Sequence, residues 1–500
     1  MEEKLGLLKT LLNEVDDLDK ALAVLGWDQQ TYMPSGGNED RGNQMATLAR
    51  IRHLKFTSDD IGRILDDLQP YIKQIDPDSN DARLVEVTRR KYDKATRVTS
   101  EWVAEFSRVT VTAEHIWEEA RDKADFSIFQ PHLEKVIEMV RQYTGFFAPF
   151  EHVYDPLLDE YEPGLKTADV QSIFASLKSE QVALIQAIGC RPQVDDSFLW
   201  QPFPENERMD FVNEIITRFG FDWHHGRLDK AIHPFTTSFG LGDVRITTRL
   251  KPAGIAMSLF STMHECGHAL YDQGYAPELN RTLLADGASM GIHESQSRMW
   301  EILVGHSRHF WNYFYPRMQK RFPAQLENIS LEKFYKGINK VAPSLIRTEA
   351  DEATYNLYIM LRLEIEIALL DGSLAVRDLP DYWNTKIQQY IGLRPSNDGE
   401  GVLQDIHWST GSFGYFPSYA LGNLLSAQLW EKICVDIPNI ERQFENGEFT
   451  DLLLWSRHNI HRHGLKFKTQ ELVQKVTGEQ INTKPYMRYL RSKYGEIYGL

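Results

Sequence analysis

Two histidines four residues apart, with a glutamate after the first, constrain the middle of this chain more than any other feature. The motif His264-Glu265-Cys266-Gly267-His268 lies in an apolar stretch without proline, which predicts a buried helix. Residues i and i+4 share one helix face, so both histidines can bind one metal ion. Glu265 projects about 100° further round the helix and can act as a base beside a metal-bound water. The motif therefore predicts a zinc site of the peptidase type.

A catalytic zinc ion has three protein ligands and keeps a fourth position for water, so we expect a third ligand downstream. Glu294, within His293-Glu294-Ser295-Gln296, is the first candidate because it follows a glycine-containing turn and begins another helical pattern. The neighbouring His293 is the rival ligand. Cys266 is excluded because it lies about 200° round the helix from His264. Without the motif, Glu294 would be an ordinary acidic residue in the first turn of a helix.

The composition indicates a globular cytoplasmic protein with no nucleic-acid or membrane partner. The 500 residues are 42% hydrophobic and 25% charged, enough for a large core and for two lobes around a groove. A net charge of -16 without a basic patch argues against nucleic acid. The cysteines number only 3, which suits a reducing compartment rather than a disulfide framework. No signal-peptide pattern occurs, and no stretch reaches the roughly 18 apolar residues of a membrane helix.

Helical periodicity dominates the chain, beginning with an apolar stripe from Leu5 to Leu22. Residues 243–250 are different: they alternate and are rich in β-branched side chains, which predicts a strand just before the metal helix. Such a strand can border a groove and pair with extended substrate if one of its edges is free. The alternative is a small structural sheet. We expect a mainly α fold, large and two-lobed, with a small β-sheet next to the zinc helix.

A second group of histidines, in Arg457-His458-Asn459-Ile460-His461-Arg462-His463-Gly464, does not predict another metal site. The three histidines do not keep one helix face, and no acid or cysteine follows at close spacing. We expect these side chains to be structural or to line the groove.

Six short motifs occur in order along the chain, and together they identify a resemblance. They are His233-Pro234-Phe235, Asp243-Val244-Arg245-Ile246-Thr247, the metal motif, the Glu294 motif, Ile346-Arg347-Thr348-Glu349-Ala350-Asp351, and Gly401-Val402-Leu403-Gln404-Asp405-Ile406-His407-Trp408. With these motifs the chain resembles the carboxypeptidase Taq family of zinc metallocarboxypeptidases over essentially its whole length.

The resemblance implies a mostly helical fold with a deep groove, a homodimer, and one Zn²⁺ per chain, which Co²⁺ can replace. It also implies that single residues are released from peptides with a free C-terminus, with broad specificity. We expect a single peptidase domain over residues 1–500, with a helical N-terminal portion at about 1–230 and a zinc-site core at about 231–420.

The order of elements is also similar to that of angiotensin-converting enzyme, in which a histidine followed by a tyrosine completes the site. By that similarity His407 and Tyr415 are the expected stabilisers of the tetrahedral transition state. The interval between histidine and tyrosine is shorter here, so Tyr419 is the alternative. His233 and Tyr419 are also expected to contact substrate. Without the resemblance, His407 and Tyr415 would be interpreted as packed core residues.

An exopeptidase must recognise the terminal carboxylate of its substrate, and the planar fork of arginine is suited to that task. Arg347 is the first candidate and Arg245 the second. The alternative for either arginine is an internal ion pair, with Glu349, Asp351 or Asp243 as the partner.

The sequence predicts a zinc metallocarboxypeptidase in which Glu265 assists the attack of zinc-bound water. An aminopeptidase is excluded, because the sequence has no Gly-x-Met-Glu-Asn element upstream of the metal motif. A zinc oligoendopeptidase is the main alternative. A catalytically silent, zinc-stabilised helical scaffold that binds peptides is a further one, although a structural zinc site would not need Glu265.

Overall fold

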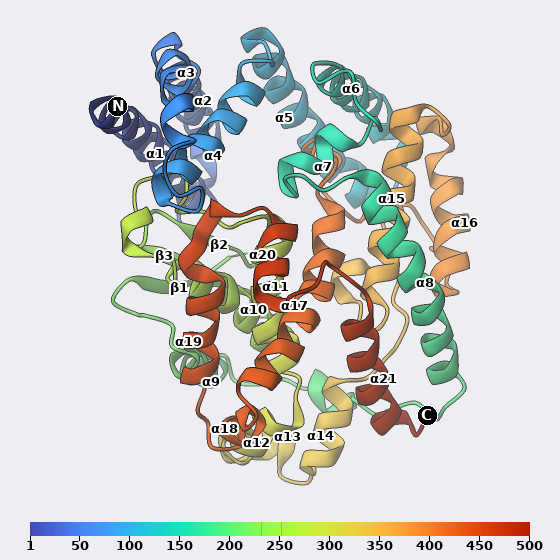
Figure 1. Cartoon of the computed structure of the whole chain (residues 1–500). Coiled ribbons are helices and arrows are strands. Elements are labelled where there is room, and N and C mark those ends of the chain that lie inside the picture. Colours follow the sequence, from blue (N-terminus) through green and yellow to red (C-terminus); the bar gives the residue numbers. More distant parts are fainter. Residues whose placement is uncertain (232, 252) are drawn as a thin grey trace. The chain divides into compact units, whose positions relative to one another are not determined.

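Helices account for most of the computed structural model of this protein, which describes residues 1–231, 233–251 and 253–500 (Figure 1). The predicted fold class, mainly α with one small sheet, is confirmed. The chain divides into two compact units, each built from three separate segments. Unit 1 comprises Met1–Thr96, Asp195–Ile338 and Ser426–Gln480, and unit 2 comprises Arg97–Val194, Asn339–Leu425 and Ile481–Leu500. That the whole chain is one peptidase domain stays a prediction.

Unit 1 contains the N-terminal helices and the metal motif. Its α-helices are α1 (Glu2–Thr31), α2 (Asn38–Phe56), α3 (Asp59–Ile72), α4 (Asn80–Ala95), α9 (Glu205–Phe219), α10 (Ala256–Asp272), α11 (Met290–Arg298), α12 (Arg308–Arg321), α13 (Pro323–Leu326), α14 (Leu331–Ile338), α18 (Ile440–Glu445), α19 (Thr450–Asn459) and α20 (Thr469–Thr477). Shorter helical turns are η1 (Ser35–Gly37), η2 (Ser197–Trp200), η3 (Pro277–Leu279), the π-helix η4 (Met299–Val304) and η7 (His461–Lys466).

Unit 2 contains the motifs around Arg347 and His407. Its helices are α5 (Ser100–Lys123), α6 (Phe126–Gly145), α7 (Asp155–Tyr161), α8 (Thr167–Gly189), η5 (Arg347–Glu349), α15 (Tyr355–Asp371), η6 (Val376–Asp378), α16 (Leu379–Ile391) and α21 (Lys484–Tyr498). Helix α17 (Phe416–Asp436) begins in unit 2 and ends in unit 1.

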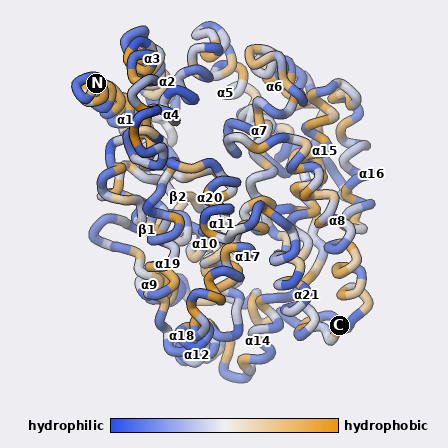
Figure 2. Tube along the Cα trace, in the orientation of Figure 1, coloured by the Kyte–Doolittle hydropathy of each residue, from blue (hydrophilic) through white to orange (hydrophobic). Residues whose placement is uncertain are grey.

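The apolar stripe predicted at the N-terminus forms the core side of α1. Leu5, Leu8, Leu12 and Val15 are buried in one cluster with residues of α3 and α4. Along α1, hydrophobic and hydrophilic turns alternate in Figure 2, as expected for a helix with one buried face. None of the described helices has both the length and the apolar composition that crossing a membrane requires. Cys190, Cys266 and Cys434 are all free in this structure.

A three-stranded sheet precedes the metal helix: β1 (Gly226–Lys230), β2 (Thr236–Ser238) and β3 (Val244–Thr248), in the order β1-β3-β2. The predicted strand is therefore confirmed as β3, but the expectation that it offers a free edge to substrate is wrong. β3 pairs with β1 in parallel and with β2 antiparallel, so both of its edges are occupied. Among the described residues, the outer edges of this sheet belong to β1 and β2. Substrate pairing along β3 is thus excluded.

The C-terminal helix α21 anchors the loop that follows the Arg347 motif. Lys493 of α21 makes a buried ion pair with Glu352, and the hydroxyl groups of Tyr494 and Tyr489 donate to the same carboxylate over 2.8 and 3.0 Å. The hydroxyl of Tyr486 donates to the backbone oxygen of Glu352. Because all these groups converge on one residue, the C-terminal helix fixes the position of the loop.

Candidate metal centre and active site

The metal motif lies on α10, and Gly267 within the motif allows α11 to approach closely. A Cβ atom at position 267 would lie 2.6 Å from Cα of Ser297 and 2.8 Å from the backbone oxygen of Gln296. Any larger residue would push the two helices apart. The close approach places Glu294, on α11, next to the two histidines of α10.

The predicted ligands His264, His268 and Glu294 come together as a candidate metal site. Nε2 of each histidine lies 3.6 Å from Oε2 of Glu294, and the three ligand atoms all lie within 4.8 Å of one another. Ligand atoms placed tetrahedrally about 2.1 Å from a zinc ion lie roughly 3.4 Å apart, which is close to the two distances between the histidines and Glu294. Elsewhere in the described ranges no other such group of three occurs.

Burial and nearby charge act differently on the two histidines. Burial lowers the pKa of His268 well below its ordinary value, so this ring is neutral. Burial would also lower the pKa of His264, but the carboxylates of Glu294 and Glu301 outweigh it and raise that pKa to about 9. A cation that binds here must therefore displace a proton from His264.

Two further residues, Arg298 at the end of α11 and Glu301 in the following π-helix η4, contact the predicted ligands. Nδ1 of His264 lies 2.8 Å from Oε2 of Glu301, which belongs to the π-helix η4. Arg298 donates to Glu294 over 2.7 Å and to Glu301 over 3.2 Å. Neither residue was predicted from the sequence. The sequence does place an acid, Glu301, seven positions after Glu294, with the basic Arg298 between them. This signal is weak, because acid–base pairs at such spacing are common on helices.

Glu265, the expected base, is only 7% exposed and is held by the sheet. Oγ1 of Thr236, on the edge strand β2, lies 2.7 Å from Oε2 of Glu265 and 2.9 Å from its backbone oxygen. Burial raises the pKa of Glu265 above its ordinary value. A carboxylate with a raised pKa is suited to take up a proton and to release it again near neutral pH.

His293, the rival ligand, lies behind His268 rather than among the ligand atoms. Its Nδ1 is 2.6 Å from Nδ1 of His268, and its Nε2 is 3.1 Å from Oδ1 of Asp272. Burial by itself would lower the pKa of His293, but the carboxylate of Asp272 outweighs it and raises that pKa. The geometry therefore favours Glu294 as the third ligand.

Arg347 makes an internal ion pair with Asp405, which was not among the partners predicted from the sequence. Nε and Nη2 of Arg347 donate to Oδ1 of Asp405 over 3.0 and 2.7 Å, and Nη1 donates to the hydroxyl of Tyr355 over 2.8 Å. The proposed partners Glu349 and Asp351 are not involved in these bonds. Three of the five N–H donors of the guanidinium are used in this way, which leaves two for a ligand.

Asp405 also binds a second arginine, Arg362, whose side chain is 0% exposed. Nε of Arg362 donates to Oδ2 of Asp405 over 2.6 Å. Burial would raise the pKa of Asp405, but the two arginines outweigh it and hold that pKa well below its ordinary range. Asp405 is therefore ionised and pairs with two buried guanidinium groups.

His407 lies beside both candidate tyrosines. Its Nε2 is 3.3 Å from the hydroxyl oxygen of Tyr419, and its ring centre is 5.6 Å from that of Tyr415. Burial lowers the pKa of His407 to about 4, so the imidazole is neutral at pH 7. The guanidinium of Arg347 lies 5.0 Å from the ring centre of Tyr419. Unit 2 thus gathers four of the expected site residues in one place: Arg347, His407, Tyr415 and Tyr419.

Arg245 shows the internal ion pair that the sequence offered as its alternative. Nε and Nη2 donate to the two oxygens of Asp243 over 2.9 and 2.8 Å. The guanidinium also lies 4.3 Å from the ring centre of Trp27 and 4.7 Å from that of Phe239. His233 is exposed and lies in the connection between β1 and β2.

The second histidine group contributes no metal ligand in the described part of the chain. His461 is buried, with Nε2 2.9 Å from Oε1 of Gln296, whereas His458 is exposed. The expected structural role therefore suits His461, which ties η7 to α11.

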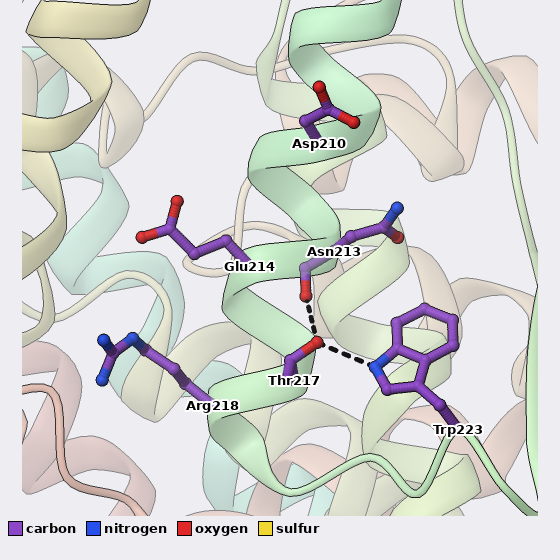
Figure 3. Close-up of a pocket in the computed structure, with 6 residues that line it drawn as sticks. All are labelled: Asp210, Asn213, Glu214, Thr217, Arg218 and Trp223. Carbon is purple, nitrogen blue, oxygen red and sulfur yellow. Dashed lines mark hydrogen bonds between the residues drawn. The ribbon is translucent and has the colours of Figure 1, made fainter.

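A surface hollow lies on α9 and the turn that follows it in unit 1 (Figure 3). Within it, the hydroxyl of Thr217 donates to the backbone oxygen of Asn213 and accepts from Nε1 of Trp223. The hollow is lined by Asp210, Asn213, Glu214, Thr217, Arg218 and Trp223. None of the expected site residues is in this set, so we assign the hollow no role.

Comparisons with known proteins agree with the geometry. The sequence pattern of the carboxypeptidase Taq (M32) metallopeptidases matches residues 7–494. Carboxypeptidase 1 of Bacillus subtilis is 39% identical over 493 residues, which cover 98% of each chain. Thermostable carboxypeptidase 1 of Thermus thermophilus is 41% identical over 487 residues, or 95% of each chain. The crystal structure of the M32 carboxypeptidase from Deinococcus radiodurans R1 matches with a TM-score of 0.96 at 39% identity, covering 100% of both chains.

Proposed function

The chain belongs to the carboxypeptidase Taq (M32) family of metallopeptidases, and from this premise we propose that it uses zinc to release single C-terminal residues from peptides. The observation that carries the choice of metal is the group of His264, His268 and Glu294, whose spacing and donor types suit Zn²⁺. Co²⁺ is expected to replace it, because the same nitrogen and oxygen donors serve both ions.

The proposed chemistry assigns the proton transfers to Glu265. When bound, the metal makes a water ligand more acidic and polarises the peptide carbonyl. Glu265 accepts a proton from the attacking water and passes it to the leaving amine. The hydroxyl of Thr236 lies against one carboxylate oxygen, so the other oxygen is left to face the water.

We propose that His407 and a tyrosine stabilise the negative charge of the transition state. A neutral imidazole can donate one N–H, and a tyrosine hydroxyl can donate one O–H, to a developing oxyanion. Tyr415 remains a candidate. The hydrogen-bonding distance between His407 and Tyr419 favours Tyr419 as the partner.

We expect peptides with a free C-terminus to lose residues stepwise, because the family acts at that end. The test is to incubate the zinc-loaded protein with one peptide as its acid and as its C-terminal amide, and to follow the products by mass spectrometry. Stepwise shortening of the acid, abolished by a chelator and restored by Zn²⁺, is the expected result. Internal fragments formed equally from both peptides would instead indicate the oligoendopeptidase.

Arg347 is proposed to bind the substrate carboxylate, with Asp405 orienting its guanidinium. Arg347→Met removes the donors and keeps a similar apolar length. Charge-assisted hydrogen bonds contribute about 1.5–3 kcal/mol each, so the preference for acid over amide, as a ratio of kcat/KM values, should fall roughly 10- to 100-fold. Arg245→Met is the matched variant. If only the Arg245→Met variant loses the preference for acid over amide, Arg245 rather than Arg347 binds the substrate carboxylate.

The proposals for the oligomeric state and the cellular compartment do not rest on the geometry of the site. We propose a homodimer on the strength of the family resemblance, and a cytoplasmic location on the strength of three free cysteines. Sedimentation of the purified protein would test the first, and fractionation of cells the second.

A further inference from the structure

Beneath the candidate metal site, three side chains form a line that runs away from the ligand atoms. His268 and Asp272 lie four residues apart on one face of α10, and His293 of α11 lies between them. The distances are 2.6 Å from Nδ1 of His268 to Nδ1 of His293, and 3.1 Å from Nε2 of His293 to Oδ1 of Asp272. The line connects a buried carboxylate to a metal ligand through a second imidazole.

The protons on this line have one arrangement that is compatible with metal binding. Nε2 of His268 faces Glu294 and is the ligand atom, so it carries no proton, and the single proton of a neutral ring must be on Nδ1. That N–H can only donate, so Nδ1 of His293 must accept. The proton of His293 is then on Nε2, where Asp272 accepts it.

Neighbouring residues fix the positions of His293 and Asp272. A Cβ atom at Gly287 would lie 2.8 Å from Cδ2 of His293, so only glycine leaves room for the ring in this position. The ring centre of Tyr271 is 5.0 Å from that of His293. The hydroxyl of Tyr275 donates to Oδ1 of Asp272 over 2.7 Å.

We propose that His293 is a positioning residue of the metal centre, which fixes the tautomer and the ring orientation of His268 and transmits the charge of Asp272 to it. The two histidine ligands are then supported differently: His264 directly by Glu301, and His268 through His293. Outer partners of this kind orient the ligand and increase its basicity. The inference rests on the zinc site of the proposed function.

The test compares two substitutions of nearly equal size. His293→Leu fills the space without a hydrogen-bond acceptor, whereas the amide oxygen of His293→Gln can accept from His268. Zn²⁺ affinity is measured without substrate, by competition with a chromophoric chelator. Loss of outer partners costs about 10- to 100-fold in metal affinity, which we expect for His293→Leu, with a clearly smaller loss for His293→Gln. His458→Ala, an exposed histidine, should bind zinc as the wild type does.

Equal affinities for the wild type and both variants would overturn the proposal. Equal losses in both variants would also overturn it, because they would show that the ring only fills space. If His293→Leu fails to fold, Asp272→Asn keeps the acceptor but removes the charge, and unchanged zinc affinity in that variant would again contradict the role. A wild type that binds zinc but cleaves no peptide would refute the proposed function alone. A wild type that binds no zinc would refute both.

Discussion

Glu265→Gln is expected to lower kcat for peptide hydrolysis by roughly 10²- to 10⁴-fold, the usual contribution of a positioned acid-base group. Glutamine has nearly the same size as glutamate, and its amide oxygen can still accept from Thr236. It cannot take up a proton at neutral pH. The ligands His264, His268 and Glu294 are unchanged, so the zinc content should stay at the wild-type value.

The measurement is the initial rate of release of the C-terminal residue at saturating substrate, together with zinc analysis of the same sample. Glu327→Gln makes the same chemical change at an exposed glutamate of the same unit and should leave both values unchanged. A Glu265→Gln variant that keeps its zinc and loses less than tenfold in rate would remove Glu265 from the proposed mechanism.

Features that depend on local spacing could be predicted from the sequence. Two histidines four positions apart on a helix must share a face, whatever surrounds the helix, so His264 and His268 could be paired before the structure was known. β3 could be predicted from alternation, but β1 and β2 could not. Their sequences, Gly-Arg-Leu-Asp-Lys and Thr-Thr-Ser, are short and largely polar. Without them the free edge of the sheet could not be located.

The hydrogen bonds and ion pairs between distant side chains that support the site could not be predicted. Arg347 and Asp405 are 58 positions apart, so no local pattern links them. Both residues lie in the motifs by which the chain resembles its family, but the partners that the sequence suggests for Arg347 are only acids close to it. Similarly, His293 is next to Glu294 in sequence, but helical geometry turns it toward Asp272 and away from the ligand atoms. Adjacency therefore suggested a ligand where the fold provides a support.

Asp405→Ala is expected to lower the free energy of unfolding of the protein by about 3–5 kcal/mol, the usual cost of removing one partner from a buried ion pair. The substitution leaves two guanidinium groups without their carboxylate. Both are buried, because the side chains of Arg347 and Arg362 are only 7% and 0% exposed. The loss is expected as a lower melting temperature, measured by calorimetry at neutral pH.

The pH dependence separates this explanation from a simple loss of packing. The folded-state pKa of Asp405 lies far below the ordinary value of 3.8, so its contribution to stability is fully present above that value and is lost as the pH falls toward the depressed pKa. The difference between the wild type and Asp405→Ala should therefore shrink in acid. Asp378→Ala removes an aspartate paired with Arg377 at 61% exposure, and should change stability by about 1 kcal/mol or less. An Asp405→Ala variant as stable as the Asp378→Ala control would show that the two arginines do not need this carboxylate.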